Sequence, residues 1–430
     1  MKRLELLRSW ILVLVSAWIA APCPQTLVWA QDIRAPFDLE TARVLPGGIR
    51  SPRFKTVFTS IDERFDGQGT AQPVSAKLNK TVTFADVIAA RSTDAEKNEI
   101  RGLLSNAGLS ETDSPGFTTG DVAVAATVFA PVFSIGLTDW WTAAIAAPIY
   151  FVNIHATSAF VAGPSAQRVI DEANKSGIEK ANEVADKLNN AVNEKLARLG
   201  YQPIANKSFT ALSDIRIINK FKVLESGDAG MMHTVTLKGE ATLPTGRVQS
   251  PDDLLSIPVG DGQWDLGAGV IYDLTLASII RLNAFGGYTA QLPSTMEHRL
   301  PTSATDSLSA DKERVWKDLG DLASTGSSVS LDLPGTGVTL GAGYMYQFMN
   351  TTSVRNGTIA AASRYRLLED LFPLRDLHSG LLMVGFSSVE MFKAKRFPLP
   401  FQANLTYSAP FGGRNSTTNS MLQTELVLFF

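Results

Sequence analysis

The stretch MHTVTLKGEATL, Met232–Leu243, alternates between two kinds of side chain. The odd-numbered residues are apolar apart from His233, and the even-numbered residues are polar apart from Met232. Because successive side chains of a strand point to opposite faces, this pattern predicts a strand with one apolar face. About twelve residues is long for a globular strand. It matches the ~9–11 residues that a tilted strand needs to cross a bilayer.

The same alternation recurs along the chain, with aromatic residues repeatedly at the segment ends, as at the interfaces of membrane barrels. About twelve such segments are present, an even number, which single-chain outer-membrane barrels require. We therefore predict an all-β fold, a transmembrane antiparallel up-and-down β-barrel over residues 53–430. The predicted strands are Arg53–Phe65, Phe117–Ala130, Trp140–Ile154, Phe209–Val223, Met232–Leu243, Gly262–Asp273, Ala277–Leu292, Ala323–Leu333, Val338–Met349, Ser379–Met391, Pro398–Ala409 and Thr418–Phe430.

The segments between these strands alternate between short and long, except that Pro410–Thr417 is short on the long-loop side. Short periplasmic turns and longer outer loops produce this alternation when both termini lie in the periplasm. Helical segments are expected in three of the long outer loops, at Gln167–Leu199, Thr83–Leu109 and Asp306–Leu322.

One region admits a different interpretation. No charged residue occurs from Val122 to Thr138 or from Trp140 to Gln167, so a hydropathy scan would predict two membrane helices there. Pro131 and Pro148 argue against these helices. A single helical hairpin would also leave the amphipathic strands without a membrane.

Residues 1–30 have the pattern of a secretory signal peptide, with basic residues, an uncharged apolar run at Trp10–Ala21 and a cleavage site after Ala30. A retained membrane anchor and lipidation at Cys23 are the alternatives. Export of this kind places the barrel in the outer membrane of a Gram-negative bacterium. Residues 31–52 contain proline and glycine without a clear strand, so a periplasmic tail and a plug in the lumen both stay open. The net charge of -3 gives no reason to expect a nucleic-acid partner.

The chain ends on MLQTELVLFF, in which Leu426, Leu428 and Phe430 share one parity. A last strand of this kind, ending in phenylalanine, resembles the signal that the bacterial barrel-assembly machinery reads. This machinery and the lipid of the outer membrane are therefore two expected partners.

Three motifs carry a family resemblance: GLTDWWTAAIAAPI (Gly136–Ile149), GEATLPTGRVQSPDDLL (Gly239–Leu255) and GDGQWDLGAGVIYDL (Gly260–Leu274). They resemble the turn and strand patterns of the meta-pathway of phenol degradation family. That family is similar to the long-chain fatty-acid and aromatic-hydrocarbon transporters of Gram-negative outer membranes. The resemblance covers roughly residues 116–293 and implies a barrel without catalytic residues.

The chain contains no nucleophile elbow, no His-Glu-x-x-His motif and no phosphate loop. We expect no catalytic site, no metal and no cofactor. A remote alternative is an outer-membrane lipid-modifying enzyme that uses His378 and a serine on the outer face. His378 and Ser379 are adjacent, however, and adjacent side chains of a strand point to opposite faces.

The inward parity of the predicted strands carries charged residues of both signs. The candidate lumen-lining residues are Arg216, Lys238, Glu240, Asp265 and Arg281. Those from consecutive strands are expected to meet, because neighbouring strands lie about 4.8 Å apart. They either line a route for a permeant or form a salt-bridge network that fills a narrow barrel. The sequence favours a channel for passive uptake of small hydrophobic or aromatic compounds, with such a permeant as a third partner. The alternative is a structural or general diffusion barrel without a dedicated ligand.

Overall fold

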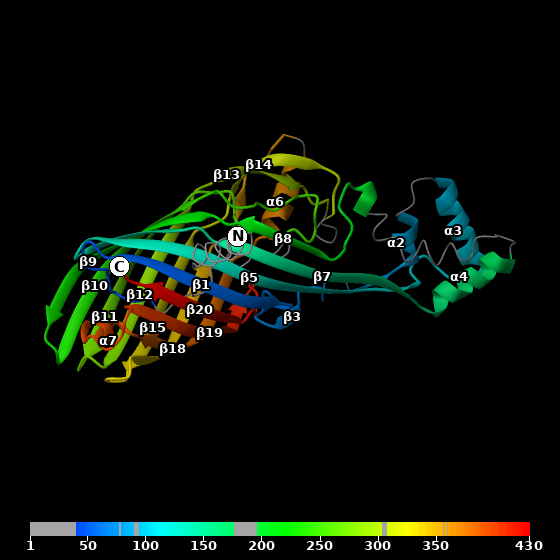
Figure 1. Ribbon diagram of the computed structural model, residues 1–430. Helices are drawn as coiled ribbons and strands as arrows, with labels where there is room; N and C mark the ends of the chain where they lie inside the picture. Colours follow the sequence, from blue (N-terminus) through cyan, green and yellow to red (C-terminus); the bar gives the residue numbers. More distant parts are fainter. Residues whose placement is uncertain are drawn as a thin grey trace, which may run out of the picture.

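The computed structural model describes residues 40–76, 79–89, 94–175, 196–302, 308–355, 357–358 and 360–430. Antiparallel strands form a closed ring with twelve positions, which confirms the predicted fold class and strand number (Figure 1). The ring strands are β1 (Arg50–Ile61), β5 (Gly116–Thr138), β6 (Trp141–Ala146), β7 (Ile149–Ala162), β8 (Lys207–Leu212), β9 (Ile215–Gly227), β10 (Met231–Leu243), β11 (Asp265–Leu276), β12 (Ile280–Gln291), β15 (Leu322–Asp332), β16 (Val338–Met349), β18 (Arg375–Ser387), β19 (Phe401–Arg414) and β20 (Met421–Leu428).

Two ring positions are each shared by two strands. β6 and β7 follow one another along β5, with a break at Ala147–Pro148 where proline has no amide hydrogen to donate. β8 and β9 occupy the next position, with a break at Ser213–Asp214. The sequence predicted each position as one strand. The ring closes because β1 pairs with β5 on one side and with β20 on the other.

Short turns gather at one end of the ring and long loops at the other. The short-turn end carries the start of β1 and the end of the chain, where Arg50 and Phe430 exchange two backbone hydrogen bonds of 2.9 Å. The smaller elements are β2 (Glu63–Phe65), β3 (Ala71–Pro73), β4 (Lys80–Val82), α2 (Phe84–Ala89), α3 (Asp94–Asn106), α4 (Pro164–Lys175), β13 (Ser294–Arg299), β14 (Lys312–Asp318), β17 (Ser353–Val354), α6 (Ala362–Asp370) and α7 (Val389–Lys393). All of them except α7 belong to the long loops.

Strands β5 and β7 continue past the ring at the long-loop end. They form an arm with α2, α3 and α4 at its tip, where Phe84, Ile88, Leu104 and Val169 make a small core (Figure 1). Nearer the ring, β13, β14, β17 and α6 pack around a second core that contains Leu300, Tyr365 and Phe372.

Three predictions in the loops and in the uncharged region need correction or completion. No helix among the described residues is long and apolar enough to span a membrane, and the uncharged region forms β5, β6 and β7. The strand predicted to end at Ala130 continues as β5 to Thr138, so residues 131–138 are not a turn between it and the strand predicted from Trp140. Within Asp306–Leu322, residues 312–318 form strand β14 in place of the predicted helix. The helix predicted at Gln167–Leu199 is observed as α4 up to Lys175, and residues 176–195 lie outside the described residues.

The alternation of β10 agrees with its predicted orientation. The side chain of Leu237 points away from the ring and is 46% exposed, whereas that of Thr236 points inward and is fully buried. An outward apolar band is what a barrel in contact with lipid requires.

This orientation predicts a dependence on depth for arginine substitutions along the outer face of β10. Leu237→Arg, near the middle of the strand, should lower the free energy of unfolding by ~2–4 kcal/mol in a lipid bilayer. Met231→Arg is the matched control, because Met231 lies on the same face beside the short turn, where the expected cost is ~0–1 kcal/mol. Denaturant unfolding of the barrel in lipid vesicles measures both values. Equal costs at the two positions would contradict the membrane-spanning orientation.

Candidate functional site

One part of the inner wall is apolar. It is formed by inward-facing side chains of β1, β5, β6 and β7, which we call the apolar stripe. On β5 it runs without a polar residue from Val122 to Val132, a length of roughly 33 Å for a strand. The stripe contains Val57, Ile61, Val122, Val124, Ala126, Val128, Ala130, Val132, Ala146, Tyr150, Val152, Ile154 and Ala156.

The part of the inner wall next to the stripe, from β9 to β12, is polar and carries ion pairs. Arg216 on β9 donates to Glu240 on β10 with an Nε–Oε1 distance of 2.5 Å. Arg281 on β12 lies 3.8 Å from Asp273 and 3.4 Å from Asp332. Unlike the lumen of a uniformly polar porin, the interior of this barrel therefore has two chemically different sides.

Residues 40–49, which precede β1, lie against the polar wall inside the barrel. The buried amide of Ala42 donates to Asp273 at 3.0 Å, and its carbonyl accepts the Thr236 hydroxyl at 2.5 Å. Lys220 donates to the carbonyl of Thr41 at 2.9 Å. The segment thus contacts side chains from three consecutive strands, β9, β10 and β11.

Glu40 is the charged residue that joins this segment to the wall. Its carboxylate accepts from Lys238 at 2.6 Å and from Lys220 at 3.1 Å. Lys238 also lies 3.6 Å from Glu240, which pairs with Arg216. Glu40 therefore completes a chain of alternating charges along the inner wall, in the order Lys220, Glu40, Lys238, Glu240 and Arg216.

The GLTD turn holds the far end of the same segment. Gly136 exchanges backbone hydrogen bonds with Gly48 at 2.8 Å and Ile49 at 2.9 Å. A Cβ at Gly136 would overlap the carbonyl oxygen of Pro46, so the segment can approach β5 only at a glycine. Asp139 accepts from the amide of Gly47 at 2.9 Å.

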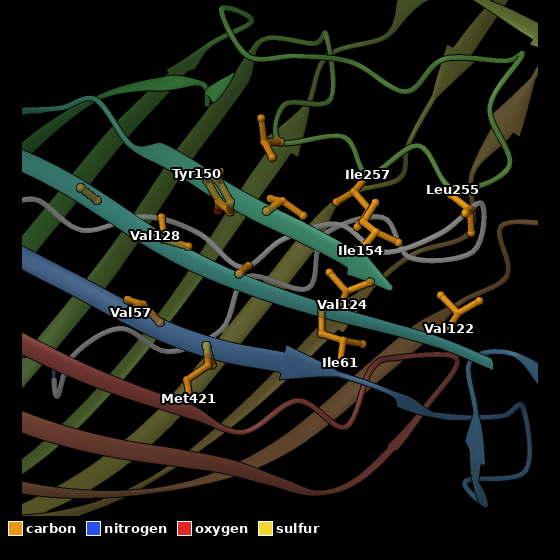
Figure 2. Packing of buried hydrophobic residues seen from close by; sticks show 14 of the residues in the cluster. Val57, Ile61, Val122, Val124, Val128, Tyr150, Ile154, Leu255, Ile257 and Met421 are labelled. Atoms are coloured by element: carbon orange, nitrogen blue, oxygen red, sulfur yellow. The ribbon is translucent and has the colours of Figure 1, made fainter. Parts of the chain in front are cut away.

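A second segment enters the barrel from the long-loop end. It consists of residues 246–261 within the connection between β10 and β11, and we call it the mouth loop. Leu255, Ile257 and Val259 of this loop are buried in the same cluster as the apolar stripe. Figure 2 shows Leu255 and Ile257 descending toward the face of β5 and β7 that carries Val124 and Ile154.

The two ends of the mouth loop meet at Asp214, in the break between β8 and β9. The Asp214 carboxylate accepts from the amide of Gly246 at 2.7 Å and from that of Asp261 at 3.2 Å. A Cβ at Gly246 would lie 2.8 Å from the Cα of Gly260, so a side chain at either glycine would separate the two ends. A compact loop with adjoining ends is an Ω-loop, a type that is frequently functional.

The outer part of the mouth loop is held by charged residues. Asp253 pairs with Lys207, and Asp252 pairs with Arg299 at 2.5 Å and with Lys312 at 3.0 Å. Partial burial by itself raises the pKa of Asp252, but the hydrogen bonds and charges of Lys312 and Arg299 outweigh it and leave this pKa below its usual range. The two ion pairs of Asp252 therefore persist at neutral pH and weaken only as the pH falls through the lowered pKa of Asp252.

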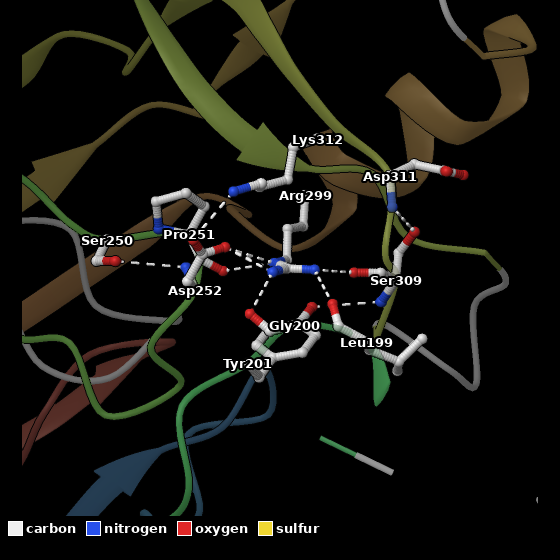
Figure 3. A network of polar contacts seen from close by, with 10 residues as sticks. All are labelled: Leu199, Gly200, Tyr201, Ser250, Pro251, Asp252, Arg299, Ser309, Asp311 and Lys312. Atoms are coloured by element: carbon white, nitrogen blue, oxygen red, sulfur yellow. Dashed lines mark hydrogen bonds and ion pairs between the residues drawn. The ribbon is translucent and has the colours of Figure 1, made fainter. Parts of the chain in front are cut away.

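Arg299 connects three long loops at this point (Figure 3). Its guanidinium donates to the carbonyls of Leu199, Gly200, Pro251 and Ser309 as well as to Asp252. The guanidinium also lies 4.0 Å from the ring centroid of Tyr201. An arginine with this many directional donors fixes the relative positions of the loops that surround it.

The five candidate lumen-lining residues lie inward, but the structure brings only some of them together. Arg216, Lys238 and Glu240 form one network. Asp265 is opposite Gln291 at the long-loop end of the β11–β12 pair, whereas Arg281 is opposite Thr275 near the short-turn end. Asp265 and Arg281 are therefore ten residues apart along the pair and do not meet.

Sequence reasoning missed the residues that fill the interior. Glu40 belongs to a segment without a periodic pattern, so nothing in the sequence singled it out. The apolar stripe did leave a signal, because Val122–Thr138 is apolar on both parities. In a barrel, this pattern indicates lipid on one face and an apolar interior on the other.

His378 lies on the outer face, beside a hollow of about 590 Å³ that is also lined by Tyr344, Tyr346 and Arg414. Its Nδ1 is 2.8 Å from the hydroxyl of Tyr344. Ser379 is buried on the opposite face of β18, so these two residues do not form a catalytic pair.

No protein-family model and no curated protein matches the chain. Among solved structures, it is similar to the COG4313 outer membrane channel from Pseudomonas putida F1, with 10% identity, 91% of this chain and 99% of that chain covered, and a TM-score of 0.50. Two further similar structures are the translocator domain of the autotransporter NalP from Neisseria meningitidis (9% identity, 90% of each chain, TM-score 0.34) and the toluene transporter TodX of Pseudomonas putida (9% identity, 90% of each chain, TM-score 0.28). At these identities the likeness concerns the fold alone. The resemblance to the meta-pathway family stays a prediction.

The residues of the expected assembly signal lie on the closing strand. Leu426 and Leu428 belong to β20, and Phe430 follows it with an exposed ring. Phe429 makes a backbone hydrogen bond to Pro400 at 3.2 Å and is less exposed.

We expect Phe430→Ser to lower the amount of assembled barrel, because the exposed terminal ring is available to the assembly machinery and contributes little to the folded interior. Phe429→Ser is the control for a loss of the same aromatic group one residue away. The measurement is the heat-modifiable fraction on gels of outer-membrane extracts. Normal assembly of Phe430→Ser would refute the role of the terminal ring.

Proposed function

We propose that this chain is an outer-membrane channel for passive uptake of small hydrophobic or aromatic molecules. The observation that carries the proposal is the apolar stripe, because the lumen of a membrane barrel is usually polar. The apolar track from Val122 to Val132 has the ~9–11 residues that a tilted strand needs to cross the bilayer, so it can follow a permeant through the hydrocarbon core. The likeness in fold to an outer-membrane channel is consistent with this role.

Orientation and export follow from the same proposal. The short-turn end and both ends of the mature chain face the periplasm, and the arm and the mouth loop face outward. Residues 1–30, which lie outside the described residues, act as the signal peptide. The barrel-assembly machinery and the outer-membrane lipid are the partners in assembly, and a hydrophobic or aromatic molecule is the permeant.

The polar wall favours the second candidate, a structural or general diffusion barrel. Its ion pairs would brace the ring and leave a narrow polar path beside residues 40–49. The two candidates differ in which wall matters for transport: the apolar stripe in the first and the polar wall in the second.

Val128→Asn tests the first candidate. Val128 lies in the middle of the apolar stripe and is buried. An amide there should raise the free energy of an apolar permeant's passage by ~1–2 kcal/mol, which is about a tenfold loss of uptake rate. Ser330→Asn on β15 places the same amide on the polar side and should leave uptake unchanged. Uptake of 1-naphthol into cells that carry each variant, wild type or no protein is the measurement. Equal uptake in all four strains would leave the diffusion barrel as the better proposal.

We further propose that residues 40–49 act as a plug at the periplasmic end. Glu40→Gln removes the charge between Lys220 and Lys238, so the segment should leave the lumen more often. We expect a higher and noisier single-channel conductance in planar bilayers. Glu240→Gln also removes a charge beside Lys238, but it keeps both hydrogen bonds of Glu40 and should have a smaller effect. A conductance of Glu40→Gln identical to that of wild type would argue against the plug.

A further inference from the structure

The mouth loop differs from an ordinary surface loop in what it buries. Loops usually run over the protein surface, with exposed and polar side chains. Here Ile257 is fully buried, and Leu255 and Val259 are only 4% and 5% exposed. All three lie inside the ring, on the apolar stripe.

The part of the apolar stripe beneath these three residues is chemically uniform. Val122, Val124 and Ile154 face the loop from β5 and β7, and none of the inward-facing stripe residues carries a charge (Figure 2). The surface therefore recognises apolar groups without regard to their detailed structure. The three loop side chains together hold about eleven carbon atoms, so an alkyl or aromatic group of that scale could replace them.

The loop is attached in two different ways. Its ends are fixed at Asp214 by buried backbone contacts and by the close approach of Gly246 and Gly260. Its outer part depends on charged side chains: Asp252 pairs with the buried guanidinium of Arg299 and with Lys312, and Asp253 pairs with Lys207. The Asp252–Lys312 pair is about a third exposed on both sides, so it contributes little and is screened by salt. The base of the loop is therefore held by backbone contacts and its outer part by ion pairs, which a substitution at Asp252 can weaken.

We propose that the patch beneath Leu255, Ile257 and Val259 is the outer binding site for the apolar portion of a permeant, and that the mouth loop covers this site until the permeant displaces it. This inference rests on the proposed uptake function and adds a site and a ligand class to it. The ligand is an uncharged alkyl or aromatic group of roughly ten carbons. The covered state keeps an apolar surface away from water when no ligand is present.

Two cysteine reporters with opposite expected responses test the site. Both are placed in a chain that carries Cys23→Ser, because Cys23 is the only natural cysteine. Ile257→Cys reports on the loop and Val124→Cys reports on the wall beneath it. The full-length protein in lipid vesicles is labelled with a membrane-impermeant maleimide, in the presence of 1-naphthol or of glucose at the same concentration.

We expect 1-naphthol to raise the labelling rate of Ile257→Cys by about tenfold and to lower that of Val124→Cys by a similar factor, because the ligand lifts the loop and covers the wall. Glucose should change neither rate. Leu255→Cys is a second loop reporter, and heat-modifiable gel mobility shows that each variant is folded. Asp252→Asn should raise the rate of Ile257→Cys without ligand. Asp228→Asn, in the β9–β10 turn at the opposite end, should not.

The outcomes separate this inference from the proposed function. Protection of Val124→Cys without a faster rate at either loop reporter means that ligand binds the stripe beside a fixed loop, which overturns the inference and keeps uptake. Unchanged rates at all reporters, with 1-naphthol uptake that still requires the protein, place the route elsewhere and also overturn it. Uptake that does not require the protein removes the proposed function itself.

Discussion

The pairing of β1 with β20 is the contact on which the rest of the structure depends. Within a bilayer no water is present to satisfy a free strand edge, so a sheet is tolerated there only when it closes. The seam runs from Arg53 opposite Val427 to Thr59 opposite Met421. Inside the barrel, Glu425 on the seam lies 3.4 Å from Arg53 and 3.8 Å from Lys55, which gives the closing pair an electrostatic match as well as its backbone hydrogen bonds.

Closure at twelve positions determines how much space the chain must fill. Eight strands leave an interior that side chains can fill, and sixteen or more leave an aqueous channel. A ring of twelve lies between these cases. This chain supplies two of its own segments to the interior, residues 40–49 and the mouth loop. Each lies against the wall that matches its polarity. Glu40 pairs with lysines of the polar wall, and Ile257 packs on the apolar stripe.

The strands could be predicted from the sequence because alternation is a local property. In β10 and β11 the odd and even residues already differ in polarity, so the orientation of Leu237 and of Asp265 follows without a structure. The height of a residue along the barrel depends on strand register, which is not local. For that reason Asp265 and Arg281 were placed on the correct face but expected to meet, although they lie near opposite ends. For residues 31–52 the sequence left a plug and a periplasmic tail equally open, and neither Glu40 nor the mouth loop has a periodic pattern that would place it inside the barrel.

The apolar stripe explains the ambiguity of its sequence. A segment that is apolar on both faces reads equally well as a membrane helix, and the two prolines, Pro131 and Pro148, argued against that interpretation. In the barrel the second apolar face points inward. A pore with a hydrophobic constriction loses its water there and stops conducting polar solutes. A barrel for general diffusion would gain nothing from such a wall. A barrel for apolar molecules would need it, together with covers that shield the apolar surface whenever no permeant is bound, and the mouth loop is placed to provide one of them.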